Sequence, residues 1–129
     1  MAGGIEIRKA HFPGRAPIEA YGGGGFRFAD MSHRGSILCL PSGIDGWEPA
    51  DAGNLQESDL QRIFAESGSI QILLAGTGKA LAPLSQELRT SLREAGISAD
   101  PMSTGAAVRT YNVLLAENRA VAAALIAVE

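Results

Sequence analysis

Apolar residues along the chain follow two patterns, the first of which is typical of β-strands. Apolar and polar residues alternate in 5–8 and again in 26–28, as expected for strands with one buried face. Continuous apolar runs, such as 35–41 between a glycine and a proline, suit strands that are covered on both faces. Together these patterns predict strands at 5–8, 18–21, 26–28, 35–41, 70–75, 97–102 and 119–128.

The second pattern, an apolar residue at every third or fourth position, predicts three helices. In the clearest of them, leucines step by four along one face between Pro83, which suits a first helical turn, and Gly96, which ends the helix. Either Ser103 or Thr104 is expected to cap the last helix through its hydroxyl group. The predicted helices cover 58–68, 83–96 and 103–117.

Glycine and proline mark the predicted loops and turns. Residues 11–17 hold two prolines and a glycine and are expected to form a loop. The four glycines 22–25 lie between two predicted strands, so they favour a flexible hairpin turn or bulge over a phosphate-binding loop. A turn is expected at 42–46, followed by a loop over 47–54.

Strands and helices alternate through most of the chain, which indicates one α/β domain over residues 1–129. Such an order calls for right-handed crossovers and a mostly parallel central sheet with flanking helices. The last strand follows its helix closely, so it is expected beside that helix, antiparallel at a sheet edge. The N-terminal strands are expected to form an added β layer.

Composition excludes several functional classes. The net charge of −3 gives no electrostatic reason to expect a nucleic-acid partner. A single cysteine, Cys39, excludes an intrachain disulfide, and its apolar neighbours predict a buried, unreactive thiol. The longest apolar run, 120–128, is too short to span a bilayer, and the N-terminus has no targeting pattern, so we expect a cytoplasmic protein.

Two segments that follow predicted strands are candidates for a binding site. Gly76, Thr77, Gly78 and Lys79 could turn backbone N–H groups toward an anion, although the segment lacks the spacing of a phosphate loop and could equally close a tight turn. The carboxyl ends of parallel strands meet at one edge of a sheet, where ligands commonly bind.

The second segment begins the last predicted helix. Thr104 and Gly105 would lie at its N-terminus, and Arg109 and Asn112, three apart, would project together. Alternatively, Arg109 is a structural residue bonded to loop carbonyls. Trp47 is a further candidate, either as an exposed partner anchor or folded over the sheet edge.

No arrangement of residues predicts catalysis. The sequence has no nucleophile–base motif, and the two histidines, His11 and His33, have no ligand-like neighbours. We therefore expect no metal, no cofactor and no catalytic residue.

Four segments of the chain, 21–28, 35–47, 74–78 and 102–117, together resemble the MTH938-like domain family. The resemblance implies a three-layer α/β fold with a mixed central sheet. It implies no established enzymatic activity or cofactor. The family includes bacterial and archaeal single-domain proteins and a mitochondrial assembly factor for respiratory complex I, which acts by binding other assembly proteins at a membrane.

These observations lead to two functional hypotheses. The first is a non-catalytic protein-binding module of a bacterial cytosol, assisting assembly of a respiratory or membrane complex; it predicts an exposed apolar patch at Trp47 or on the last helix. The second is a small-molecule or anion-binding protein, or a minor enzyme, that uses the edge formed by 76–79 and 104–112. A homodimer is compatible with both.

Overall fold

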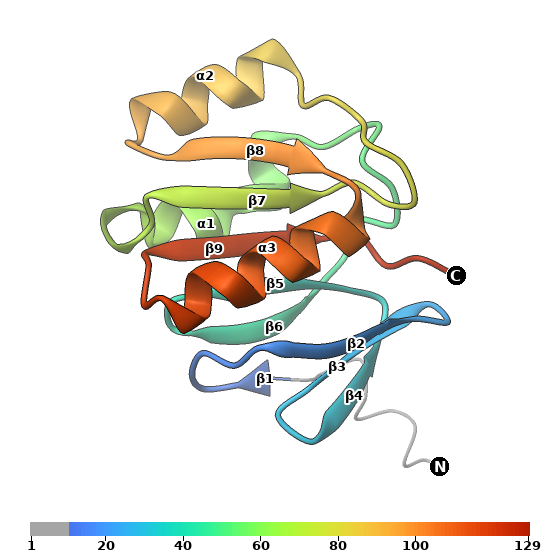
Figure 1. Cartoon of the computed structure of the whole chain (residues 1–129). Coiled ribbons are helices and arrows are strands. Elements are labelled where there is room, and N and C mark those ends of the chain that lie inside the picture. The colour runs from blue at the N-terminus through green and yellow to red at the C-terminus, as the bar shows by residue number, and fades with distance from the viewer. Residues whose placement is uncertain (1–10) are drawn as a thin grey trace.

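A computed structural model describes residues 11–129 (Figure 1). The strand expected at 5–8 lies outside the described residues. The strands are β1 (His11–Phe12), β2 (Ile18–Gly22), β3 (Gly25–Phe28), β4 (Met31–Arg34), β5 (Ser36–Leu40), β6 (Gly43–Trp47), β7 (Ile72–Gly76), β8 (Ser98–Met102) and β9 (Val121–Leu125). The α-helices are α1 (Gln61–Ala65), α2 (Gln86–Glu94) and α3 (Thr104–Ala116), and short 3-10 turns flank α1 at Glu57–Leu60 and Ser67–Ser69.

The strands form two sheets. A six-stranded sheet has the order β1-β6-β5-β9-β7-β8, and β2, β3 and β4 form a separate antiparallel sheet. In the larger sheet β7 runs parallel to both β8 and β9, whereas the β9–β5, β5–β6 and β6–β1 pairs are antiparallel. The predicted α/β fold with a mixed central sheet and an added N-terminal β layer is confirmed. The expectation that this sheet is mostly parallel was wrong, because three of its five strand pairs are antiparallel.

Three layers are built on the alternation of apolar side chains along the central strands. Successive residues point to opposite faces, so Leu73 packs with α1 and α2 on one face while Leu74 packs with α3 and the small sheet on the other. Figure 1 shows α3 and β2–β4 in front of the large sheet and α1 behind it.

The prediction that β9 lies at an edge of the sheet was wrong, although β9 does pair antiparallel with β5. β9 lies inside the sheet between β5 and β7. All five of its residues are buried and none is polar, which is the composition of a strand covered on both faces. β9 follows α3 closely in the sequence, and α3 packs directly over β9 in the structure (Figure 1).

Residues 42–47 were predicted as a turn and the start of a loop, but Gly43–Trp47 is a strand paired with both β5 and β1. Glycine serves strand packing here rather than a turn. A side chain at Gly43 would overlap the backbone carbonyl oxygen of Phe12. The expected loop at 11–17 likewise begins with the short strand β1, and β4 was not predicted.

The helices differ from prediction mainly at their starts. The α2 helix begins at Gln86, where the Ser85 hydroxyl accepts a hydrogen bond from the Leu88 amide, so Pro83 precedes the helix instead of opening it. Of the two candidate caps for α3, Ser103 fills the role. None of the helices within residues 11–129 is long and apolar enough to cross a membrane.

Candidate functional site

The two predicted segments meet at the carboxyl ends of β7 and β8, as expected. The Thr104 amide donates to the Gly78 carbonyl at 2.8 Å, and the Gly78 amide donates to the Thr104 hydroxyl oxygen at 3.0 Å. The Thr77 amide bonds the Met102 carbonyl at 2.8 Å. The loop after β7 is thereby tied to the start of α3.

Both threonine hydroxyls at this edge are engaged within the protein. The Thr104 hydroxyl, fully buried, donates to the Ile126 carbonyl at 2.7 Å. The Thr77 hydroxyl lies 2.8 Å from the Ala80 carbonyl and accepts from the Ala82 amide at 2.9 Å. These groups stabilise the loop and are not directed at a ligand.

Gly76 is explained by packing at the same edge. A Cβ atom there would lie 2.9 Å from Leu125 and 3.0 Å from the Thr104 Cα atom, so only glycine lets α3 approach the end of β7. Lys79 and Arg109 remain as exposed cations on the two sides of this edge, and neither forms an ion pair within the described chain.

Asn112 connects α3 to the small sheet. Its side-chain oxygen accepts from the Ile18 amide at 2.8 Å, and its side-chain nitrogen donates to the Ile18 carbonyl at 2.9 Å. The Asn112 side chain therefore bonds the backbone of Ile18 as a neighbouring strand would, and it fixes the position of the small sheet against α3. It does not project with Arg109 toward a common ligand.

Trp47 belongs to the core. Its side chain is 6% exposed, and the indole nitrogen donates to the Asp59 carbonyl at 2.7 Å. Of the two alternatives for this residue, the structure has the buried one, so Trp47 is not available as a partner anchor.

An exposed surface forms where β2 passes the first half of α3. The Tyr21 hydroxyl lies so close to Gly105 that a Cβ atom at 105 would overlap it, and the Arg109 guanidinium is 3.7 Å from the same point. Farther along the helix Val113 is 57% exposed. We refer to Tyr21, Ala106, Arg109, Thr110 and Val113 as the α3 surface.

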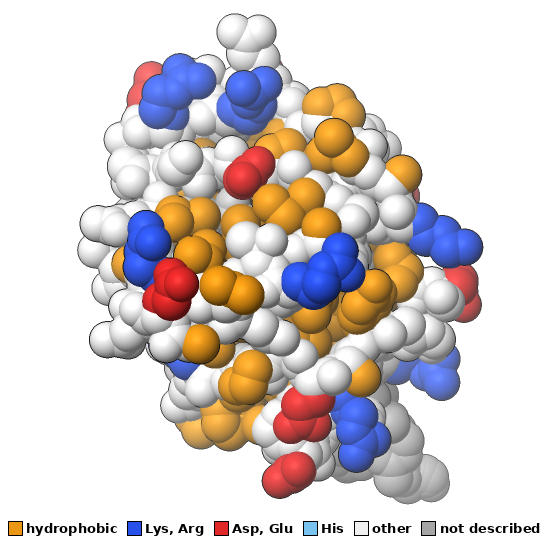
Figure 2. Space-filling model, viewed as in Figure 1, with side chains coloured by type: hydrophobic (Ala, Val, Ile, Leu, Met, Phe, Trp, Pro, Cys, Tyr) orange, Lys and Arg blue, Asp and Glu red, His pale blue; other side chains and the backbone are white. Residues whose placement is uncertain are grey.

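Figure 2 shows apolar side chains spread over the face of the molecule that carries α3, with Lys or Arg and Asp or Glu side chains among them. Tyrosine and arginine are among the residue types that most often dominate binding energy at protein interfaces. The α3 surface therefore has the composition of a protein-contact site.

Cys39 belongs to a buried polar cluster in which Tyr111 of α3 contacts both Cys39 and Arg15. Burial raises the pKa of its thiol from an ordinary value of 9.0 to about 12, an effect that the hydrogen bond to Tyr111 only partly offsets. Burial also raises the pKa of Tyr111, against the smaller lowering effect of the Arg15 guanidinium. Arg15 closes the cluster by donating to the Arg119 carbonyl at 2.7 Å.

We expect the stability of the protein to fall at alkaline pH because of Cys39. A thiol whose folded-state pKa is raised contributes its full stabilisation below pH 9, and this contribution is lost as the pH rises toward 12. Urea unfolding at about pH 8 and about pH 10.5, on either side of the ordinary thiol pKa, should show this loss. A Cys39→Ala variant should lose less between the two pH values, and equal losses in both proteins would contradict the assignment.

No group of three or more His, Cys, Asp or Glu side chains in the described part of the chain is arranged to hold a metal ion. His11 and Arg62 both bond the carboxylate of Asp45 and so join β1, β6 and α1. This cluster is a structural contact at the sheet edge.

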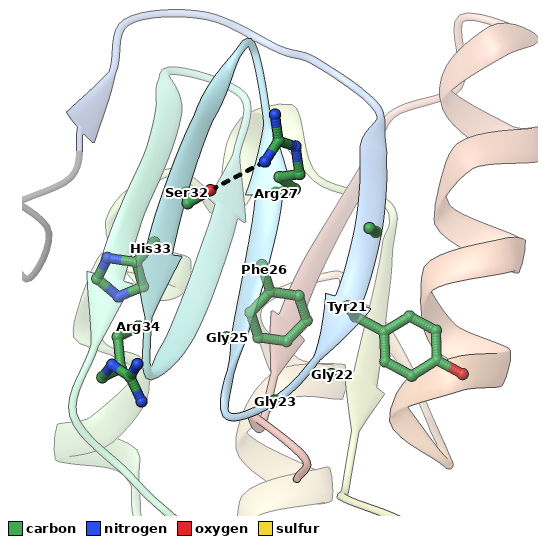
Figure 3. A pocket seen from close by; sticks show the side chains of 10 residues that line it. Tyr21, Gly22, Gly23, Gly25, Phe26, Arg27, Ser32, His33 and Arg34 are labelled. Atoms are coloured by element: carbon green, nitrogen blue, oxygen red, sulfur yellow. Dashed lines mark hydrogen bonds between the residues drawn. The ribbon is translucent and has the colours of Figure 1, made fainter.

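Sequence reasoning missed a concave area on the outer face of the small sheet. Figure 3 shows Arg27 on β3, beside Ser32, and Arg34 at the end of β4 that lies nearer the glycines of the β2–β3 hairpin. The cavity has a volume of about 280 Å³. The sequence signal for this area is one arginine in each of two neighbouring strands, Gly25–Phe28 and Met31–Arg34. It was missed because the second strand was not predicted.

Comparison with known proteins identifies the chain's relatives. A model of a family of proteins of unknown function, DUF498/DUF598, matches residues 18–126. An uncharacterised protein of Rhodobacter capsulatus is 40% identical over 119 residues, which cover 92% of this chain and 90% of the relative. The mouse NADH dehydrogenase [ubiquinone] 1 alpha subcomplex assembly factor 3 is 26% identical over 95% of this chain, and the alignment spans 66% of the mouse protein.

Solved structures share the fold. A Bartonella henselae protein described as an outer membrane protein is 64% identical with a TM-score of 0.88, over 92% of this chain and 99% of that one. An Mth938-like domain from Bordetella pertussis is 27% identical with a TM-score of 0.76, over 87% of this chain and 85% of that one. These matches confirm the resemblance that the sequence motifs indicated.

Proposed function

The chain belongs to the DUF498/DUF598 family of Mth938-like proteins, and from that membership we propose that it is a non-catalytic protein-binding module assisting assembly of a respiratory or membrane complex. The observation that carries the proposal is the relationship to NADH dehydrogenase assembly factor 3, which extends over 95% of this chain. The proposed place of action is the cytoplasm.

The α3 surface is the proposed contact site. Val113 is an exposed aliphatic residue on a helix whose other face is buried against β7 and β9. Arg109 has no ion-pair partner within residues 11–129, so its guanidinium can bond a partner without breaking an existing ion pair. Tyr21 beside it supplies a large side chain with one polar atom.

A charge placed at the centre of this surface should abolish partner binding. We expect tagged wild-type protein to recover subunits or assembly proteins of a respiratory complex from detergent-solubilised host membranes, and Val113→Asp to recover at least about tenfold less, the loss typical of disrupting an interface hot spot. Leu81, 65% exposed in the loop before α2, provides a matched control as Leu81→Asp. Quantitative mass spectrometry of the eluates makes the comparison.

Two results would contradict the proposal. Equal recovery of partner proteins by Val113→Asp and Leu81→Asp would show that the α3 surface is not the contact site. If the wild type recovered no protein of a respiratory or membrane complex, the proposed assembly role would be contradicted. Light scattering of the purified protein shows whether the same surface instead pairs two copies of the chain, since Val113→Asp would then convert a dimer to a monomer.

A further inference from the structure

The outer face of the small sheet carries two arginines that form no ion pair with an acidic group of residues 11–129. In the antiparallel register Arg27 lies opposite Ser32, and Arg34 lies opposite Gly25. Alternation along β3 directs Phe26 and Phe28 into the core, while Arg27 and Arg34 are exposed. The two guanidinium groups therefore share one solvent-facing side of β3 and β4 (Figure 3).

Glycines make this face concave. Gly22, Gly23 and Gly25 form a part of the cavity floor that is bare backbone, and Ala20, Tyr21, Phe26 and His33 complete the lining beside the arginines and Ser32. The floor is also fixed in place: the Gly24 amide donates to the Val128 carbonyl at 2.7 Å, and the Gly35 amide donates to the Gly24 carbonyl at 2.7 Å. A hairpin tied on both sides presents a preorganised surface.

The arginines keep most of their hydrogen-bonding capacity. Arg27 reaches the Ser32 hydroxyl at 3.5 Å, which is a weak contact. Among the described residues, those that line the cavity include no Asp or Glu, although acidic residues outnumber basic ones in the chain as a whole, 14 to 11. The cavity lining is therefore positively charged, whereas the chain as a whole is negatively charged.

We propose that this concave face binds an oxyanion, a carboxylate or phosphate group of a small solute. Two arginine forks can each donate paired N–H groups to such an anion, and the Ser32 hydroxyl can rotate to donate a further hydrogen bond. The cavity volume of about 280 Å³ leaves room for such a group. The groups proposed to bind the anion, on Arg27, Ser32 and Arg34, do not belong to the α3 surface, although Tyr21 of that surface also lines the cavity.

Titration of 15N-labelled protein with inorganic phosphate and, separately, with citrate tests the proposal and distinguishes the two sources of oxyanion. We expect saturable shifts of the amide signals of Gly22, Gly23, Gly25 and Ser32 with at least one of them. Sodium chloride at equal ionic strength should not reproduce these shifts. Arg34→Gln should weaken binding at least about tenfold, because it removes a charge-assisted fork, and Arg34→Lys should weaken it less.

The control is Arg93→Gln, which removes an exposed arginine from α2 without touching this face. The absence of saturable shifts in the wild type, or unchanged binding by an Arg27→Gln/Arg34→Gln double variant, would overturn the proposal. The wild-type titration is decisive even if a variant does not fold. The Val113→Asp variant should bind the anion normally, so the outcome is independent of the proposed assembly role.

Discussion

Replacing Gly25 by alanine should lower the free energy of unfolding by about 3 kcal/mol, the cost of a steric overlap that no side-chain movement can relieve. The new methyl group would overlap the carbonyl oxygen of His33 on the paired strand β4. Because that oxygen belongs to the backbone, β3 and β4 must separate to make room. Urea unfolding followed by circular dichroism measures the change.

Two other glycines provide matched controls for this variant. Within residues 11–129, no atom lies within 4 Å of the position that a methyl group would take at Gly23, but the φ of Gly23 is 60°. Gly23→Ala should therefore cost about 1 kcal/mol of left-handed backbone strain. Gly68 is equally open and has no such φ, so Gly68→Ala should be neutral or slightly stabilising. If all three variants unfolded at the same urea concentration, steric overlap at Gly25 would be excluded.

Replacing Thr104 by valine should destabilise the protein by about 2–4 kcal/mol, because it removes the hydroxyl partner of a buried carbonyl and of a part-buried amide. The fully buried hydroxyl bonds both the Ile126 carbonyl and the Gly78 amide. Valine keeps the shape of the side chain and removes only this bridge. Calorimetric or urea unfolding would show the loss.

Thr104→Ser is the control for this second prediction. Serine keeps the hydroxyl and removes a methyl group, so we expect a cost of about 1 kcal/mol. Equal destabilisation by valine and serine would mean that packing of the methyl group, rather than the hydrogen-bonded bridge, holds the loop after β7 against α3.

The sequence predicted those parts of the fold that depend on local periodicity. The continuous apolar runs correctly marked β5, β7 and β9, and the leucine spacing marked α2. Prediction failed where glycine serves close packing between strands, as in β6, because a glycine needed for approach to Phe12 looks identical to one needed for a turn.

The candidate site was only partly predictable for the same kind of reason. Topology correctly brought 76–79 next to Thr104, since both follow parallel strands. The use of the Thr77 and Thr104 hydroxyls within the protein depends on carbonyl groups of Ala80 and Ile126, whose positions no sequence pattern reveals. The contact between Tyr21 and Gly105 is likewise a product of tertiary packing alone.

The place of β9 in the sheet has a consequence for synthesis of the protein. Its two neighbours, β5 and β7, come earlier in the chain and do not pair with each other; in the strand order of residues 11–129, β9 lies between them. During synthesis, the β1-β6-β5 part and the β7-β8 part therefore cannot pair through β9 until residues 121–125 have left the ribosome. Until then, the strands β5 and β7 each have an unpaired, apolar edge. Folding of the large sheet is completed only then, and the two unjoined parts are natural substrates for a ribosome-associated chaperone.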